Sequence, residues 1–167
     1  RLQGSYIKDK QFIYDNQIVD QISGYYVLTP FVLKGDSRAI LINRGFIPWN
    51  GRRDQIADID IGAKIAEVKV QISKPVKRME LKASEITQDF PVLVQALDVD
   101  EMSAIASLDF ANIVGLLGPE SENGFVRKWD PYTGSIERHI GYAIQWFLMA
   151  LVLSIIGTLL ALKQQRK

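Results

Sequence analysis

Residues 24–43 are Gly24-Tyr25-Tyr26-Val27-Leu28-Thr29-Pro30-Phe31-Val32-Leu33-Lys34-Gly35-Asp36-Ser37-Arg38-Ala39-Ile40-Leu41-Ile42-Asn43. The run up to Leu33 is rich in aromatic and β-branched residues, which is typical of a strand. Residues 34–37 form a turn by composition, and residues 39–43 are an almost continuous apolar strand. The sequence therefore predicts a hairpin at the centre of a sheet.

Further segments predict strands around this hairpin. Ser5 to Ile7 and Gln11 to Tyr14 flank a turn-like Lys8-Asp9-Lys10. Ile65 to Ile72 alternates between apolar and polar residues, as expected of a strand with one wet face. We expect this strand to pair antiparallel with the earlier ones.

The following part of the chain adds one short helix. Pro91 to Leu97 is an apolar run, residues 98–107 predict a helix capped by Asp98 or Asp100, and Asn112 to Leu117 return to strand. The elements predict an α+β domain with a curled antiparallel sheet or partial barrel and few helices, followed by a C-terminal transmembrane helix.

The transmembrane helix is predicted from the apolar run that extends from Ile140 to Leu162 without a charge. At about 1.5 Å per residue it makes a helix of roughly 35 Å, enough to cross a hydrocarbon core of about 30 Å. Lys163, Arg166 and Lys167 follow it, and short basic tails stay in the cytoplasm. The sequence thus predicts an extracytoplasmic domain at residues 1–137, a membrane span at 138–162 and a cytoplasmic tail at 163–167.

The composition excludes several kinds of site. With no Cys and a single His, one protomer cannot build disulfides, thiolate metal sites or a three-His zinc site. The formal net charge is +1, and −2 without the three basic residues of the tail, which argues against nucleic-acid binding. Asp58 with Asp60, and Asp98 with Asp100, are typical of solvated loops and helix caps. We find no acid, base or nucleophile cluster and predict that the chain is not an enzyme.

His139, Tyr142 and Trp146 form the most informative group of side chains. Their spacing of i, i+3, i+7 places them within about 60° of one another on a helix, with Gln145 beside them. The simpler interpretation is an aromatic belt at the membrane interface. The alternative is that the imidazole of His139 ligates the metal of a planar macrocycle, with the two aromatic rings packed against it. A polar amide at position 145 is expected to face another helix or a bound molecule.

Asn43-Arg44-Gly45-Phe46-Ile47-Pro48-Trp49 is a second feature of interest, at the end of an apolar strand. One interpretation is a strand-to-turn junction where Gly45 permits a bulge and Arg44 pairs with a local carboxylate. The other gives Arg44 a surface role, in which it binds a propionate or a partner's carboxylate with both terminal nitrogens.

Five segments together resemble the surfeit locus protein 1 family, in this order and at similar spacing. They are Arg1-Leu2-Gln3-Gly4-Ser5-Tyr6, Gly24-Tyr25-Tyr26-Val27-Leu28-Thr29-Pro30, Ile42-Asn43-Arg44-Gly45-Phe46-Ile47-Pro48, Gly124-Phe125-Val126-Arg127-Lys128-Trp129 and His139-Ile140-Gly141-Tyr142-Ala143-Ile144-Gln145-Trp146-Phe147. The match runs almost end to end, although the charged residues 75–90 depart from the family pattern.

Members of that family are assembly factors for haem-copper cytochrome c oxidase and are not generally regarded as enzymes. Two membrane helices flank their extracytoplasmic domain. The resemblance therefore implies a first helix upstream of Arg1 and, for a bacterial member, a periplasmic domain anchored in the inner membrane. In bacterial members the His that opens the second helix is implicated in binding haem a, and the matching position here is His139.

The resemblance implies assistance with haem a delivery or insertion, with haem a synthase, the oxidase core subunit and the lipid bilayer as partners. The expected site residues are His139, Tyr142, Trp146 and Arg138 around the cofactor, and Arg44 and Gln145 as contacts to a propionate or a partner.

A competing hypothesis is a haem-free scaffold or chaperone that stabilises an oxidase subunit in an assembly intermediate. Its helix would pack through the small residues Ala150, Ser154, Gly157 and Ala161. A third possibility is an anchored enzyme or sensor with a ligand pocket in the sheet, against which stands the lack of any recognisable acid, base or nucleophile cluster.

Overall fold

The computed structural model describes residues 1–51, 55–62, 65–75, 89–129 and 136–165. The chain divides into two units, Arg1–Trp129 and Asp130–Lys167. In the first unit the chain forms β1 (Leu2–Tyr6), η1 (Lys8–Lys10), β2 (Phe12–Val19), β3 (Ile22–Leu33), β4 (Ala39–Pro48), β5 (Ile65–Val68), β6 (Val70–Ser73), β7 (Val92–Val94), α1 (Val99–Ala106) and β8 (Phe110–Leu117). The second unit contains α2 (Ile136–Gln165).

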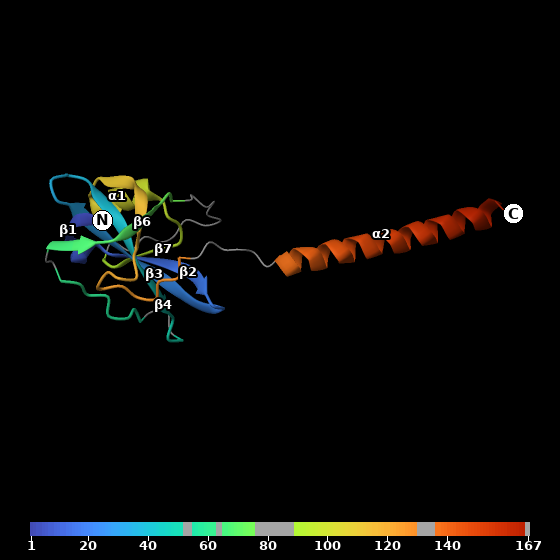
Figure 1. Ribbon diagram of the computed structural model, residues 1–167, viewed down its shortest axis with the longest axis horizontal. Coiled ribbons are helices and arrows are strands. Elements are labelled where there is room, and N and C mark those ends of the chain that lie inside the picture. The colour runs from blue at the N-terminus through green and yellow to red at the C-terminus, as the bar shows by residue number, and fades with distance from the viewer. Residues whose placement is uncertain (52–54, 63–64, 76–88, 130–135, 166–167) are drawn as a thin grey trace. The chain divides into compact units, whose positions relative to one another are not determined.

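One mixed sheet contains all these strands (Figure 1), in the order β5-β1-β3-β4-β8-β6, with β2 paired to β3 and β7 paired to β2. The predicted hairpin is confirmed, since β3 and β4 pair antiparallel and occupy the centre of this order. Two parallel pairs, β2 with β7 and β4 with β8, were not predicted.

The strand predicted over Ile65 to Ile72 is divided at Lys69 into two strands. β5 pairs antiparallel with β1, whereas β6 pairs antiparallel with β8, at the opposite end of the sheet. Because one residue separates the two end strands, the sheet must curl until β5 and β6 lie close to each other at Lys69. The backbone nitrogen of Gly118 donates to the Lys69 carbonyl at 2.7 Å, and that of Lys69 donates to the Ser121 hydroxyl at 3.1 Å. These bonds fix the bend, and the predicted curled sheet is confirmed.

The sheet is buried on both faces because its strands alternate between two apolar surfaces. One surface packs against Val99, Met102 and Ala106 of α1, which is capped by the Asp98 side chain as predicted. The opposite, inner surface includes Tyr6, Phe31, Ile40, Ile42, Val68 and Leu117. On β4 the alternation continues from Ile40 and Ile42 to Arg44, so this arginine faces the inside of the curl.

Gly45 forms the predicted bulge. Tyr26 is opposite Phe46 and Leu28 is opposite Asn43, so two residues of β4, Arg44 and Gly45, face one residue of β3. The φ of Gly45 is +123°, and a Cβ at this position would lie 2.8 Å from the carbonyl oxygen of Val126.

We expect Gly45→Ala to destabilise the domain by about 2–4 kcal/mol, since it adds a clash to a backbone conformation that L side chains rarely adopt. Urea unfolding followed by near-UV circular dichroism measures this loss. Gly35→Ala is the matched control, because Gly35 has a φ of +86° but no atom within 4 Å of an added Cβ. An equal loss in the two variants would contradict the close approach at Gly45.

The second unit contains the predicted apolar helix. Within α2, the segment His139–Gln165 is long and apolar enough to cross a membrane. The hydroxyl groups of Ser154 and Thr158 donate to the carbonyls of Ala150 and Ser154, both at 2.8 Å, so neither is left without a partner in an apolar environment. Regular helix continues past the predicted end at Leu162, because the following Lys163, Gln164 and Gln165 are good helix formers.

Candidate functional site

Arg44 is at the centre of a buried polar network inside the curled sheet. Its side chain is only 2% exposed. The Nε atom donates to the carbonyl oxygen of Asn123 at 2.8 Å, and Nη1 donates to the carbonyl of Ile59 at 2.7 Å and to Oε1 of Gln11 at 2.9 Å. The guanidinium carbon lies 4.9 Å from the centre of the Phe125 ring. One side chain thus joins β4 to three segments that are distant in the sequence.

Two neutral side chains complete the network. The Thr29 hydroxyl donates to Gln11 Oε1 at 2.7 Å, and Gln11 Nε2 donates to the Ile59 carbonyl at 3.3 Å. Both residues are buried, so each of these bonds is shielded from competing water. The sequence placed Gln11 and Thr29 in strands but did not single them out as site residues. A polar side chain within or beside an apolar strand is a signal of such a network.

The bulge at Gly45 is present, but both sequence interpretations gave Arg44 partners that need correction. Its hydrogen-bond acceptors are carbonyl and amide oxygens, and no carboxylate among the described residues forms an ion pair with it. Its burial also rules out a surface clamp for a propionate or for a partner's carboxylate. The local sequence could not show this, because the acceptors come from residues 11, 59 and 123.

Removal from water has the largest effect on the pKa of Arg44. Burial lowers the pKa of its guanidinium, because desolvation disfavours the charged form. Attraction to Tyr6, Asp60 and Asp58 opposes this effect on the pKa. An arginine remains charged even so, which leaves a buried positive charge whose direct partners are neutral.

The predicted stripe lies on α2, near its N-terminal end. His139 and Gln145 are exposed, and Tyr142 and Trp146 are 63% and 70% exposed. Since all four belong to one α-helix, the spacing of i, i+3, i+7 places the imidazole and the two rings on one face. This face is available to lipid, to another helix or to a planar ligand. The backbone of Arg138 belongs to the same helix, and its side chain is outside the described residues.

These two features provide different chemistry. Arg44 belongs to the first unit and the stripe to the second. Within the described ranges, no group of three or more His, Cys, Asp or Glu side chains could hold a metal ion. The imidazole of His139 can supply one axial ligand to a metal that a macrocycle already holds.

A model of the SURF1 family matches residues 1–151 of the chain. The matched segment contains the whole sheet, Arg44 and the stripe from His139 to Trp146. No curated protein and no solved structure matches the chain.

Proposed function

The chain belongs to the SURF1 family of cytochrome c oxidase assembly factors, and we propose that it assists the delivery or insertion of haem a into the oxidase core subunit. The family is one of assembly factors and not of enzymes. The exposed stripe of His139, Tyr142 and Trp146 on an apolar helix of the family-matched segment carries this proposal.

The residues of the stripe fit haem a in chemical type. The haem iron accepts a neutral imidazole as an axial ligand, and His139 is the only imidazole in the chain. Tyr142 and Trp146 offer exposed aromatic surface on the same face of α2. One histidine supplies one axial ligand, so the other axial position is open or is filled by a partner. When bound, haem a is cargo: the chain holds it and keeps it in an apolar environment.

We assign the helix to the inner membrane, with the sheet on the periplasmic side. Support comes from Lys163 in the last turn of α2 and from the basic residues that follow it in the sequence. A ligand held near the N-terminal end of α2 would lie at the periplasmic face of the membrane in this orientation, and haem a synthase is the partner we propose as the donor.

A haem-free scaffold is the second candidate function. It is favoured by the small residues Ala150, Ser154, Gly157 and Ala161, which recur along α2 at spacings of four, three and four. Small residues let membrane helices approach closely. In this case α2 would pack against an oxidase subunit and the stripe would serve as an interfacial anchor.

The visible spectrum of the full-length protein, purified after co-expression with haem a synthase, tests the first proposal. We expect a haem a band that is lost in His139→Ala at equal protein load, because the variant lacks the axial ligand. Ile140→Ala is the control, since it alters the neighbouring position without removing a ligand. A band of equal strength in His139→Ala would contradict the ligand assignment, and no band in any of the three proteins would favour the scaffold.

A further inference from the structure

The hairpin that joins β2 to β3 extends beyond the other strands of the sheet (Figure 1). β7 pairs with β2 only as far as Tyr14, and β4 pairs with β3 only from Gly24 onward. The carbonyl of Ser23 still accepts a hydrogen bond from the Trp49 nitrogen at 3.1 Å. Beyond it, no other described strand pairs with residues 18–22. These five residues, which we call the hairpin tip, therefore project from the sheet.

The hairpin tip is apolar on both of its faces. Val19 is directly opposite Ile22, so these two side chains share one face, and Ile18 belongs to the other. Ile18 is 73% exposed and Ile22 is 53% exposed. Asp20 and Gln21 form a two-residue turn with φ values of +51° and +66°. Because this turn is so short, no loop separates the apolar side chains from the end of the hairpin.

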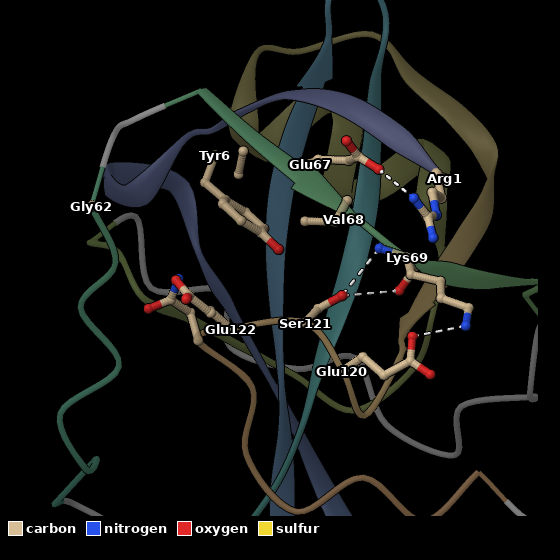
Figure 2. Close-up of a pocket in the computed structure, with 11 residues that line it drawn as sticks. Arg1, Tyr6, Gly62, Glu67, Val68, Lys69, Glu120, Ser121 and Glu122 are labelled. Carbon is tan, nitrogen blue, oxygen red and sulfur yellow. Dashed lines mark hydrogen bonds and ion pairs between the residues drawn. The ribbon is translucent and has the colours of Figure 1, made fainter.

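The surface beside β5 is different in character. Figure 2 shows a cavity of about 630 Å³ at whose rim Lys69 pairs with Glu120 at 2.8 Å. Charged side chains of this kind are well solvated by water. In the first unit the structure describes five exposed large apolar side chains, and of these only Ile18 and Ile22 flank the same turn. The hairpin tip is therefore the most concentrated exposed apolar feature of the described part of this unit.

The last residue of the first unit packs on the strand that carries the hairpin tip. The indole Nε1 of Trp129 donates to the Leu117 carbonyl at 2.8 Å, and its ring centre lies 5.7 Å from that of Tyr26 on β3. His139, where the segment able to cross a membrane begins, follows ten residues later. Ten residues span at most about 33–36 Å in any conformation. The surface of the membrane that α2 crosses is therefore within reach of β3.

The charge of the hairpin tip is balanced by a residue next to Trp129. The carboxylate of Asp20 forms an ion pair with the ammonium group of Lys128, and Gln21 is neutral. An unpaired carboxylate would oppose contact with an apolar phase. A paired one opposes it less, and the long lysine side chain can keep its charged end in water. The tip can therefore meet lipid without an uncompensated charge.

We propose that the hairpin tip inserts into the headgroup region of the membrane that α2 crosses. A protein groove would cover one face of a ribbon, whereas lipid surrounds an inserted end and accepts apolar side chains on both faces. The contact is shallow, because the backbone of the two turn residues needs water or headgroups as hydrogen-bond partners. Together with α2 it fixes the orientation of the sheet on the membrane. This contact requires α2 as a membrane span and is independent of haem a.

Quenching of a fluorescent label by lipid tests this contact in the full chain, reconstituted into phosphatidylcholine nanodiscs. Because the chain contains no Cys, Gln21→Cys gives a unique site for a nitrobenzoxadiazole label at the tip. Ser37→Cys is the matched control, since it is exposed in the turn that follows the other end of β3. We expect lipids with a nitroxide near the headgroup to quench the label at position 21 about twofold or more strongly than the label at position 37.

Ile18→Thr combined with Ile22→Thr tests the apolar side chains, because threonine is polar but keeps the β-branched shape that strands favour. In this double variant, quenching at position 21 should fall to the level at position 37. Ile72→Thr makes the same change at an exposed residue of β6 and should leave the quenching unaltered. The urea midpoint should stay close to that of the parent, since both replaced side chains are largely exposed.

Equal quenching of the two labels in the parent would overturn the proposal. Stronger quenching at position 21 that persists in the double Thr variant would also overturn it, because the apolar side chains would not be its cause. If the labels are quenched equally and the double Thr variant no longer co-purifies with the oxidase core subunit, the tip binds protein and not lipid. The haem a spectrum is a separate readout and should be the same in the parent and in the double Thr variant.

Discussion

Arg44→Met is expected to lower the free energy of unfolding of the domain by about 3–5 kcal/mol, because it removes the donor of a buried network and leaves the acceptors in place. Methionine fills much of the same volume, so the loss comes from hydrogen bonds and not from a cavity. The Asn123 carbonyl would lose its bond to Nε, and Gln11 and Ile59 would keep only their weaker contacts with each other and with Thr29. Replacing a whole buried network by apolar groups can be neutral, but here one partner alone is removed.

Urea unfolding of the full chain in detergent, followed by near-UV circular dichroism, measures this effect in the domain. Arg38→Met is the matched control, since Arg38 is exposed and pairs with Asp36 at 3.1 Å on the surface. That pair is expected to contribute less than about 1 kcal/mol. Arg44→Lys should fall between the two, because an ammonium keeps the charge but not the planar set of donors. Equal losses in the two Met variants would show that the network does not stabilise the fold.

Local patterns explain which parts of the fold could be predicted from the sequence. The central hairpin and α1 are coded by contiguous residues, and both were found. The break at Lys69 could not be found, because residues 66–73 alternate between apolar and polar without interruption and the two halves differ only in their partners. The parallel pairs β2 with β7 and β4 with β8 likewise join segments that are far apart in the chain.

The candidate sites also include one that contiguous residues predict and one that depends on distant partners. The stripe from His139 to Trp146 follows from helical periodicity alone, and the helix is present. Arg44 was recognised as notable, but neither a local ion pair nor a surface role describes it, because its acceptors come from three distant segments.

Charges at the centre of α2 are expected to abolish its insertion. Each Arg at the centre of a membrane helix costs about 2.5–3.5 kcal/mol, and each Leu or Ile removed loses a further 0.3–0.6. Leu151→Arg combined with Ile155→Arg therefore costs about 6–8 kcal/mol, which matches or exceeds what the apolar residues of the helix supply. The C-terminus of this variant should remain on the same side of the membrane as the sheet domain.

The absence of Cys from the chain makes this prediction directly measurable. A Cys introduced as Gln165→Cys at the end of α2 is a unique label for a membrane-impermeant maleimide applied to intact spheroplasts. The parent should stay unlabelled, because its tail is cytoplasmic in the orientation that we propose, and the central double variant should be labelled. Ala161→Arg with Leu162→Arg is the matched control: it adds the same two charges beside Lys163, where long side chains reach the headgroups, and should stay unlabelled. A labelled parent would show that the C-terminus is periplasmic, which contradicts the orientation that we propose. If instead the central variant stayed unlabelled beside an unlabelled parent, the insertion argument would be wrong, because two arginines at the centre would then be tolerated.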